Sequence, residues 1–304
     1  MSEPLVSVIV GVYNKTRYVE ECLQGVLAQT YPHFELIVVD DASTDGSADR
    51  VAALGDSRIR LVRRSQNSGL PAVPRNEAMR LAHGDFLAFL DADDLWMPNK
   101  LEQQVAYFQA NPDVNLCHTR CVVIDAEGRL LHERHPGVRL PEGDCLLPLL
   151  EHCWISISTV MVRRVLADRI GLFDECPGLR AREDYDWLRR AASETPFGLL
   201  DGCLAAYRTA IDGISRTAGN WRSRPRDYLS HLDALKNADT WHGKISRRRL
   251  KEIALGAAEE NSFYWRARGE RRKAAWFAWQ MVCLAPENLR GLRHLAAALL
   301  RSGR

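Results

Sequence analysis

The 304-residue sequence lacks a hydrophobic run long enough to cross a lipid bilayer. Its longest nearly apolar stretch extends from Ala274 to Ala285 and is interrupted by Gln280. A membrane-spanning helix needs about 20 apolar residues, so this stretch is too short. The first residues also lack the basic-then-apolar layout of a secretory signal peptide. We therefore expect a protein that is neither embedded in a membrane nor exported.

The sequence also lacks paired cysteines. It contains eight cysteines, and no two of them form a C-x-x-C pair. His118 and His132 do not provide zinc-site spacing around Cys117 and Cys121. This pattern predicts reduced, mostly packed thiols in a cytosolic protein and argues against a structural zinc.

A large net charge is absent as well, although the charges are unevenly distributed. The formal net charge is +2, with 46% hydrophobic and 26% charged residues, which is typical of a globular protein. Residues 216–304 contain 19 Lys and Arg against 8 Asp and Glu, a surplus of +11, which leaves 22 against 31, or −9, for residues 1–215. An acidic body suits a divalent-cation site, and a basic C-terminal third suits an anionic surface or ligand. The alternative is that the arginines only solvate helix faces.

Strand and helix patterns alternate in the first half of the chain. The apolar, β-branched runs predict strands at 7–12, 35–39, 59–62 and 86–90, and helical spacing predicts helices at 18–30, 47–54, 75–82 and 98–109. This order predicts a mostly parallel sheet that is covered on both faces.

The pattern changes after Cys117. We expect a hairpin made of residues 117–124 and 130–133, strands at 156–162 and 199–208, and a helix at 183–193. Only helical patterns remain from Trp221 onward, and Gly213, Gly219 and Pro225 mark the expected boundary.

Polar clusters follow three of the predicted strands, namely Tyr13-Asn14, Asp40-Asp41 and Asp91-Ala92-Asp93-Asp94. In parallel sheets, ligands bind at the carboxyl ends of the strands. Asp91 and Asp93 could reach one hard cation, although Asp-x-Asp also occurs as a plain turn, and Asp94 could cap the next segment. Asp41 could accept a hydrogen bond from a nucleotide base or ribose, or could belong to a solvated turn.

Four segments together are far more specific than any of them alone. VSVIVGVYN, ELIVVDDASTDGS, NSGLPAVPRNEA and FLDADD occur in this order, and the chain over roughly residues 5–215 resembles the family-two glycosyltransferases, an inverting group with the GT-A fold. The resemblance implies a GT-A-type, mostly parallel sheet flanked by helices. It implies a catalytic domain at 1–215, with a donor half at about 1–115 and an acceptor half at about 116–215, and leaves 216–304 as a basic, all-helical extension.

The resemblance also implies roles for the residues that match the motifs of the donor half. Val12, Tyr13 and Asn14 resemble the loop that cradles the nucleotide base, and Asp41 resembles the acid that recognises it. Arg75 resembles the basic residue near the nucleotide-sugar, although the preceding proline replaces the commoner alanine.

The remaining implied roles concern carboxylates. Asp91 and Ala92 would contact the donor, while Asp91 and Asp93 would bind Mn²⁺ or Mg²⁺, with Asp93 as the more direct ligand. The segment ARED resembles the Glu-Asp motif of the family, and Asp184, or else Glu183, would be the catalytic base. Otherwise these two acids are only favourable first-turn residues of an exposed helix.

The expected activity is a single inverting displacement. One sugar would pass from a nucleotide-sugar donor, most commonly a UDP-sugar in this family, to a hydroxyl of a glycan, lipid-linked or glycoconjugate acceptor in surface polysaccharide biosynthesis. The Gln-x-x-Arg-Trp signature of processive synthases is absent, so we expect one sugar per encounter. The alternatives are a nucleotidyltransferase, whose Gly-rich, Lys-containing loop is absent, and a non-catalytic nucleotide-sugar-binding or scaffold protein.

The C-terminal helices combine tryptophans and basic residues with a leucine stripe that includes Leu289, Leu292 and Leu299. Such a segment fits an anionic membrane surface or a lipid-diphosphate acceptor. Alternatively, it packs on the catalytic domain or forms a homodimer face, since single amphipathic helices usually face a core. No nucleic-acid recognition motif accompanies the charge. We therefore expect a cytoplasmic protein that could be peripheral on the inner face of the membrane.

Overall fold

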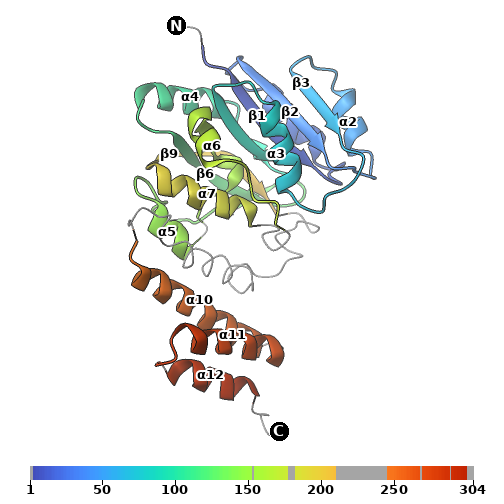
Figure 1. The fold of residues 1–304 in the computed structure, drawn as a ribbon. Helices are drawn as coiled ribbons and strands as arrows, with labels where there is room; N and C mark the ends of the chain where they lie inside the picture. Colours follow the sequence, from blue (N-terminus) through green and yellow to red (C-terminus); the bar gives the residue numbers. More distant parts are fainter. Residues whose placement is uncertain are drawn as a thin grey trace. The chain divides into compact units, whose positions relative to one another are not determined.

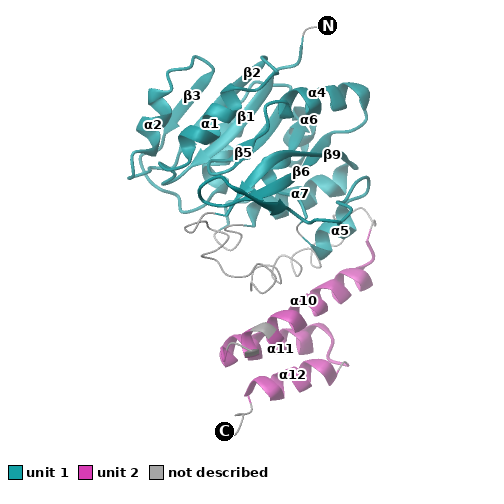
Figure 2. Cartoon of the chain, turned by 180° about the vertical axis from the view of Figure 1, so that it is seen from behind, with its two compact units in different colours: residues 1–211 teal, residues 212–304 magenta. Residues whose placement is uncertain are grey.

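The computed structural model describes residues 3–152, 154–176, 182–209, 245–267, 269–287 and 289–299. The chain divides into two compact units, residues 1–211 and 212–304 (Figure 2). The boundary predicted after residue 215 lies in 210–244, outside the described residues.

A twisted sheet forms the centre of the first unit (Figure 1). Its strands are β1 (Val6–Val12), β2 (Phe34–Asp40), β3 (Ile59–Arg63), β4 (Phe86–Asp91), β5 (Leu95–Trp96), β6 (Leu116–Ile124), β7 (Leu130–Glu133), β8 (Met161–Arg163) and β9 (Phe197–Arg208). They lie in the order β3-β2-β1-β4-β8-β6-β9-β5, and β7 pairs with β6.

The sheet is parallel in its first part and mixed in its second. β1 pairs in parallel with both β2 and β4, and β3 continues the parallel arrangement beside β2. β8 runs antiparallel to its neighbours β4 and β6, whereas β9 runs parallel to β6. The β6–β7 hairpin confirms the prediction for residues 117–133.

Helices cover both faces of the parallel part of the sheet. The helices described in the first unit are α1 (Val19–Leu27), α2 (Ser47–Ala53), α3 (Ala72–Leu81), α4 (Lys100–Ala110), α5 (Leu146–Glu151), α6 (Arg164–Ile170) and α7 (Glu183–Glu194). Val10 and its same-face neighbours belong to a core shared with α1 and α4. On the opposite face Gly11 faces Pro74 of α3, whose Cγ would lie 3.2 Å from an added Cβ. Phe89 packs edge-on against Trp187 of α7. Burial on both faces explains the continuous apolar runs seen in these strands.

The prediction of a strand over residues 156–162 is wrong in its first half. Ile157–Thr159 form a 3₁₀ turn, η1, and the strand β8 begins only at Met161. The Thr159 amide and hydroxyl both donate to the Ser156 carbonyl, at 3.0 and 2.7 Å. Hydroxyl groups that bond to the local backbone compete with a strand ladder, and the apolar pattern of a sequence does not reveal that competition.

The second unit contains the helices α10 (Arg247–Ala267), α11 (Arg271–Leu284) and α12 (Leu289–Leu299), so the predicted helical extension is present. Ala254 and Ala258 of α10 pack with Phe277 and Met281 of α11. No helix among the described residues is both long and apolar enough to cross a bilayer.

Helix α12 turns two small residues, and not its exposed leucines, toward the core of its unit. Gly291 and Ala298 are its buried residues, whereas Leu289, Leu292 and Leu299 are 62%, 47% and 65% exposed. The leucine stripe therefore does not face the core of this unit, contrary to the more usual arrangement of a single amphipathic helix.

Candidate active site

Three neighbouring strands end at one edge of the sheet. In register, Val12 of β1 lies opposite Asp40 of β2, and Gly11 lies opposite Asp91 of β4. The Asp41 amide donates to the Val12 carbonyl at 2.8 Å and so fixes the chain beyond β2 against the end of β1. The predicted polar clusters are therefore brought together, as expected at the carboxyl edge of a parallel sheet.

The loop after β1 is fastened to the loop after β2. Asn14 has a φ of +50°, a left-handed conformation that asparagine tolerates better than most residues. Its amide donates to Ser43 Oγ and its Oδ1 accepts from the Thr44 amide, both at 2.9 Å. Val12 is buried, whereas Tyr13 is 46% exposed beside this loop. A partly exposed aromatic ring at a strand end is available for contact with a ligand.

Asp41 is buried and organises a second loop. It accepts hydrogen bonds from Asn67 Nδ2 at 3.0 Å and from the Ser68 amide and hydroxyl at 3.0 and 2.7 Å. Arg64 Nε lies 3.3 Å from its Oδ1. The carboxylate thus holds the Asn-Ser-Gly loop against the end of β2. A role for Asp41 in recognising a base stays a prediction.

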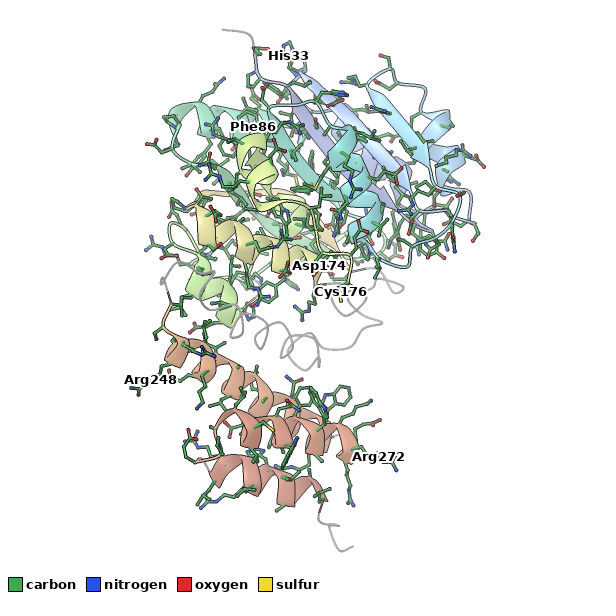
Figure 3. The ribbon with its side chains drawn as sticks, in the orientation of Figure 1. His33, Phe86, Asp174, Cys176, Arg248 and Arg272 are labelled. Carbon is green, nitrogen blue, oxygen red and sulfur yellow. The ribbon has the colours of Figure 1, made fainter. Side chains whose placement is uncertain are left out.

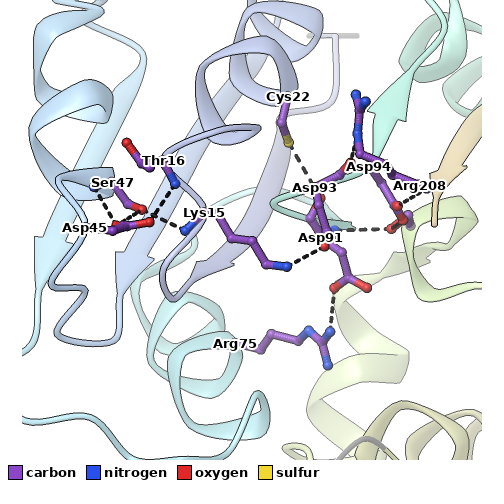
Figure 4. Close-up of polar contacts among 11 residues, drawn as sticks. Lys15, Thr16, Cys22, Asp45, Ser47, Arg75, Asp91, Asp93, Asp94 and Arg208 are labelled. Atoms are coloured by element: carbon purple, nitrogen blue, oxygen red, sulfur yellow. Dashed lines mark hydrogen bonds and ion pairs between the residues drawn. The ribbon is translucent and has the colours of Figure 1, made fainter. Parts of the chain in front are cut away.

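Asp91 is the last residue of β4 and Asp93 follows the strand, and each pairs with a basic side chain (Figure 4). Arg75 Nη2 lies 2.5 Å from Asp91 Oδ1, and Lys15 Nζ lies 2.5 Å from Asp93 Oδ2. Ala92, between them, is buried in the hydrophobic core. Burial raises the pKa of Asp93; Lys15 opposes this rise, and Asp91 adds to it.

Asp94 is a buried structural carboxylate and not the helix cap that the sequence suggested. Its Oδ2 accepts from Ser158 Oγ at 2.6 Å, and its Oδ1 accepts from the Arg208 amide at 2.9 Å. Ser158 Oγ in turn accepts from the Asp91 amide at 3.1 Å. Burial, with the nearby Asp93 and Asp91, raises the pKa of Asp94 well above its usual value. The contacts tie η1 and β9 to the end of β4.

Arg75 connects the end of β4 with the start of α7. Its Nη1 lies 2.6 Å from Glu183 Oε1, while Nη2 holds Asp91. Burial alone would lower the pKa of Arg75, but Asp91, Glu183 and Asp184 outweigh it and raise the pKa above its ordinary value. The guanidinium therefore stays charged and holds these carboxylates in a fixed arrangement.

Glu183 and Asp184 occupy different environments at the N-terminus of α7. Glu183 is buried, and its two oxygens accept from Arg75 and from the Arg182 amide. Burial raises the pKa of Glu183 against the opposing effect of Arg75. Asp184 is only partly buried, and its Oδ1 accepts from the Tyr185 amide at 2.8 Å. Asp184 is thus the more accessible of the two carboxylates. Ala181, at the start of the ARED segment, lies outside the described residues.

The carboxylates after β4 fit a divalent cation that keeps part of its shell for other ligands. The described residues contain no group of three or more His, Cys, Asp or Glu that could hold a metal by themselves. Mg²⁺ and similar ions are commonly held by one or two carboxylates together with water and substrate phosphates, and the Asp91–Asp93 pair provides that donor set. Burial, and to a smaller extent the neighbouring carboxylates, raise the pKa values of Asp93 and Asp94, and added positive charge would oppose that rise.

Three residues of this network were not assigned from the sequence: Lys15, Ser158 and Arg208. Lys15 directly follows the Tyr-Asn pair, which is the one local signal for its position. Ser158 and Arg208 contact the Asp91–Asp94 segment from 64 to 115 residues away in the chain. No local sequence pattern indicates contacts of that kind.

A sheet of this topology, flanked by helices, has the GT-A type of fold. The model of the family "Glycosyl transferase family 2" matches residues 7–171, and the chain belongs to this family.

Two curated relatives show how far the similarity extends. The "Putative teichuronic acid biosynthesis glycosyltransferase TuaG" of Bacillus subtilis is 34% identical over 235 residues, which cover 76% of this chain and 88% of that protein. The "UDP-Glc:alpha-D-GlcNAc-diphosphoundecaprenol beta-1,3-glucosyltransferase WfgD" of Escherichia coli is 32% identical over 233 residues, which cover 75% and 87%.

Solved structures agree in fold. S. aureus TarS 1–349 in complex with UDP-GlcNAc has a TM-score of 0.70 at 20% identity, covering 96% of this chain and 88% of that one. The mannosyltransferase PcManGT from Pyrobaculum calidifontis, in complex with GDP-Man and Mn²⁺, has a TM-score of 0.56 at 22% identity, covering 98% and 86%.

Proposed function

We propose that this glycosyltransferase moves a single sugar, with inversion, from a nucleoside-diphosphate sugar to an acceptor hydroxyl. The observation that carries the proposal is the position of Arg75, which joins Asp91 at the end of β4 to Glu183 at the start of α7. The proposed donor site and Glu183, the neighbour of the proposed base Asp184, are thereby held by one set of ion pairs. Transfer requires this proximity, because positioning supplies much of the rate enhancement.

In this proposal the chain's own residues divide the chemistry. Asp184 takes the proton from the acceptor hydroxyl as that oxygen attacks the anomeric carbon. Glu183 keeps Arg75 charged and oriented near the leaving diphosphate. Asp91 and Asp93 would hold Mn²⁺ or Mg²⁺, which supplies positive charge for the leaving group when bound.

The edge of the sheet also suggests how the donor is recognised. Val12, Tyr13 and Asn14 would cradle the base, with Tyr13 offering an exposed ring to it. Asp41 would bond to the base or support the loop that does. Ala92, which is buried, would contribute through its backbone.

The names of the relatives support a setting for the reaction. One names UDP-Glc and a diphosphoundecaprenol acceptor, another names teichuronic acid biosynthesis, and a structural neighbour holds UDP-GlcNAc. We infer a UDP-sugar donor and a glycan, lipid-linked or glycoconjugate acceptor in polysaccharide biosynthesis. Retention of both the Asp pair and a separate base candidate favours catalysis over a scaffold role, since a binding module needs no base.

A donor panel tests this function. The purified chain is titrated with UDP-, GDP- and dTDP-sugars, with and without Mn²⁺, and thermal unfolding and release of nucleoside diphosphate are followed. We expect one nucleotide to raise the unfolding temperature in a metal-dependent way, by the equivalent of about 2.7 kcal/mol at a hundredfold excess over Kd. Asp93→Ala should abolish the shift. No shift with any donor would instead support a scaffold role, or a site that is completed only by a partner or a membrane.

We also propose that the second unit contacts an anionic lipid surface through α12. The exposed leucines of α12 are accompanied by Arg290 and Arg293, and residues 289–304 contain no acidic residue. Arg248 and Arg272 extend from α10 and α11 into solvent (Figure 3). An apolar stripe flanked by arginines suits an anionic bilayer, because the lipid headgroups attract the arginines and the acyl chains bury the leucines. If the stripe instead contacted α12 of a second copy, the arginines of the two helices would repel each other.

A further inference from the structure

The side chain of Lys15 lies against one of the two proposed metal ligands. Its ammonium is 2.5 Å from Asp93 Oδ2, and the two side chains are only 18% and 17% exposed (Figure 4). A partly desolvated ion pair interacts more strongly than one in bulk water. Asp93 is therefore already neutralised before any added cation reaches it.

The backbone of Lys15 is firmly held, whereas its side chain is long and flexible. The amides of Asn14, Lys15 and Thr16 donate in turn to Ser43 Oγ, Ser47 Oγ and Asp45 Oδ2, at 2.8 to 2.9 Å. These bonds fasten the loop to the segment after β2. A lysine carries its charge on a flexible four-carbon stem, so the ammonium can leave Asp93 while the loop stays in place.

Arg75, which pairs with the neighbouring Asp91, cannot leave its partner as easily as Lys15 can. Its guanidinium is buried and divides its two ends between Asp91 and Glu183. Moving Arg75 would leave two carboxylates unpaired, one of them buried, which is costly. Displacing Lys15 from Asp93 exposes a carboxylate that a divalent cation would then take over.

The diphosphate of a nucleotide-sugar offers the displaced ammonium a new partner. It carries negative charge to the edge of the sheet where β1 and β4 end side by side. Lysine pairs readily with phosphate as a point charge. Donor and cation would then each favour the arrangement in which Lys15 has left Asp93.

We propose that Lys15 is an internal counter-cation that competes with the divalent cation for Asp93, and that the donor diphosphate draws it away so that cation and donor bind cooperatively. The donor half of this proposal rests on the proposed function, whereas the competition for Asp93 does not.

The first test uses Mn²⁺ alone with the full-length chain. Free Mn²⁺ is followed by electron paramagnetic resonance during titration of the wild type, Lys15→Met, Lys15→Arg and Arg17→Met. We expect Lys15→Met to bind Mn²⁺ at least about tenfold more tightly than the wild type, which corresponds to about 1.4 kcal/mol. Lys15→Arg keeps the charge and should stay close to the wild type.

Two further variants control this measurement. Arg17 is two residues away and pairs with Glu127 on the surface, so Arg17→Met removes a nearby positive charge without touching Asp93. It should leave the Mn²⁺ affinity unchanged. Asp93→Asn combined with Lys15→Met should bind Mn²⁺ no better than the wild type, because the ligand itself is then missing.

Repeating the titration with UDP or GDP measures the cooperativity. The wild type should gain about 5- to 150-fold in Mn²⁺ affinity when its nucleotide is present, the usual range for coupled sites. The gain should shrink in Lys15→Met, because the competing ammonium has already been removed.

The outcomes separate the two proposals. An unchanged or weakened Mn²⁺ affinity in Lys15→Met would overturn the role of Lys15, even if donors bind and transfer occurs. Tighter Mn²⁺ binding in Lys15→Met, together with no response to UDP, GDP or any nucleotide-sugar, would support the competition for Asp93 and count against the proposed function.

Discussion

Two adjacent acids show how strongly environment divides the roles of similar side chains. Glu183 is buried and bonded to Arg75 and the Arg182 amide, whereas Asp184 is partly exposed at the same helix end. Asp184 lies in the first turn of α7, where the positive end of the helix interacts favourably with a carboxylate. Of the two, only Asp184 can meet an acceptor without breaking an existing ion pair.

Asp184→Asn should leave donor binding nearly intact and reduce transfer by about 10²- to 10⁴-fold, the usual contribution of a positioned base. Donor affinity is measured by calorimetry and transfer by nucleoside-diphosphate release with acceptor present. Glu183→Gln is the matched comparison, because it should also disturb the unfolding midpoint by leaving Arg75 with one buried partner fewer. Turnover like that of the wild type in Asp184→Asn would remove this residue from the mechanism.

Lys100 is a buried lysine outside the site. It is fully buried, its Nζ lies 2.5 Å from Gln104 Oε1 and 4.1 Å from the centre of the Trp96 ring, and burial lowers its pKa to about 7. The unfolded chain holds this proton up to its ordinary pKa of 10.5, whereas the folded chain releases it above about 7. Between these pH values the unfolded state binds more protons, so stability rises with pH.

We therefore expect Lys100→Met to increase the free energy of unfolding at pH 7 and to remove a pH-dependent rise of a few kcal/mol between pH 7 and pH 10. Urea denaturation at pH 7, 8 and 9 measures both effects. Lys251→Met, at a partly exposed lysine of the second unit, serves as the control. It should keep the increase of the unfolding free energy with pH. If the unfolding free energy of Lys100→Met increases with pH as much as that of the wild type, burial does not destabilise the Lys100 ammonium.

At the scale of elements, close approach between β1 and the turn before β4 depends on a missing side chain. A Cβ on Gly84 would lie 2.6 Å from the Ser7 amide nitrogen and 2.7 Å from the Leu5 carbonyl oxygen. Both are backbone atoms of the central strand region and cannot turn aside. The Gly84 amide also donates to Ser7 Oγ at 2.8 Å, which fixes the turn there.

Gly84→Ala should therefore destabilise the first unit by about 1–3 kcal/mol, the range for overpacking. Gly25→Ala is the matched variant, because an added Cβ in α1 would meet only the Trp96 carbonyl oxygen, at 3.8 Å. It should stabilise by about 0.5–1 kcal/mol through helix propensity. Unfolding midpoints in urea distinguish the two, and equal effects would contradict the steric argument.

The elements also show what sequence alone can predict. The strands over 6–12, 34–40 and 86–91 and the acids at their ends were predictable, because apolar runs fix buried strands and polar residues mark where they end. The 3₁₀ turn over Ile157–Thr159 was not, because the bonds from Thr159 to the Ser156 carbonyl that compete with a strand leave no mark in the apolar pattern of the sequence. Likewise, the 3.6-residue period of α12 identified a helix, but it could not reveal that Gly291 and not the leucines would face α11.

At the scale of the whole molecule, the two units carry opposite charge. Residues 1–211 contain 22 Lys and Arg against 30 Asp and Glu, a net charge of −8, and residues 212–304 contain 19 against 9, a net charge of +10, so the two sum to +2. Such asymmetry favours cations at the first unit and anions at the second. It also makes attraction to an anionic surface dependent on ionic strength.

Vesicle flotation tests the proposed contact between α12 and lipid. The full-length chain should float with vesicles of phosphatidylglycerol and phosphatidylcholine at low salt and less so at 1 M salt, where screening reaches about 3 Å. Leu292→Ser combined with Leu299→Ser should reduce flotation, since both side chains are exposed on one stripe. Ala297→Ser, exposed on the same helix but off that stripe, should float like the wild type.

If the double variant instead abolishes a concentration-dependent dimer seen by light scattering, the leucines face a second copy of the chain. Absence of flotation at every lipid composition would exclude the membrane contact.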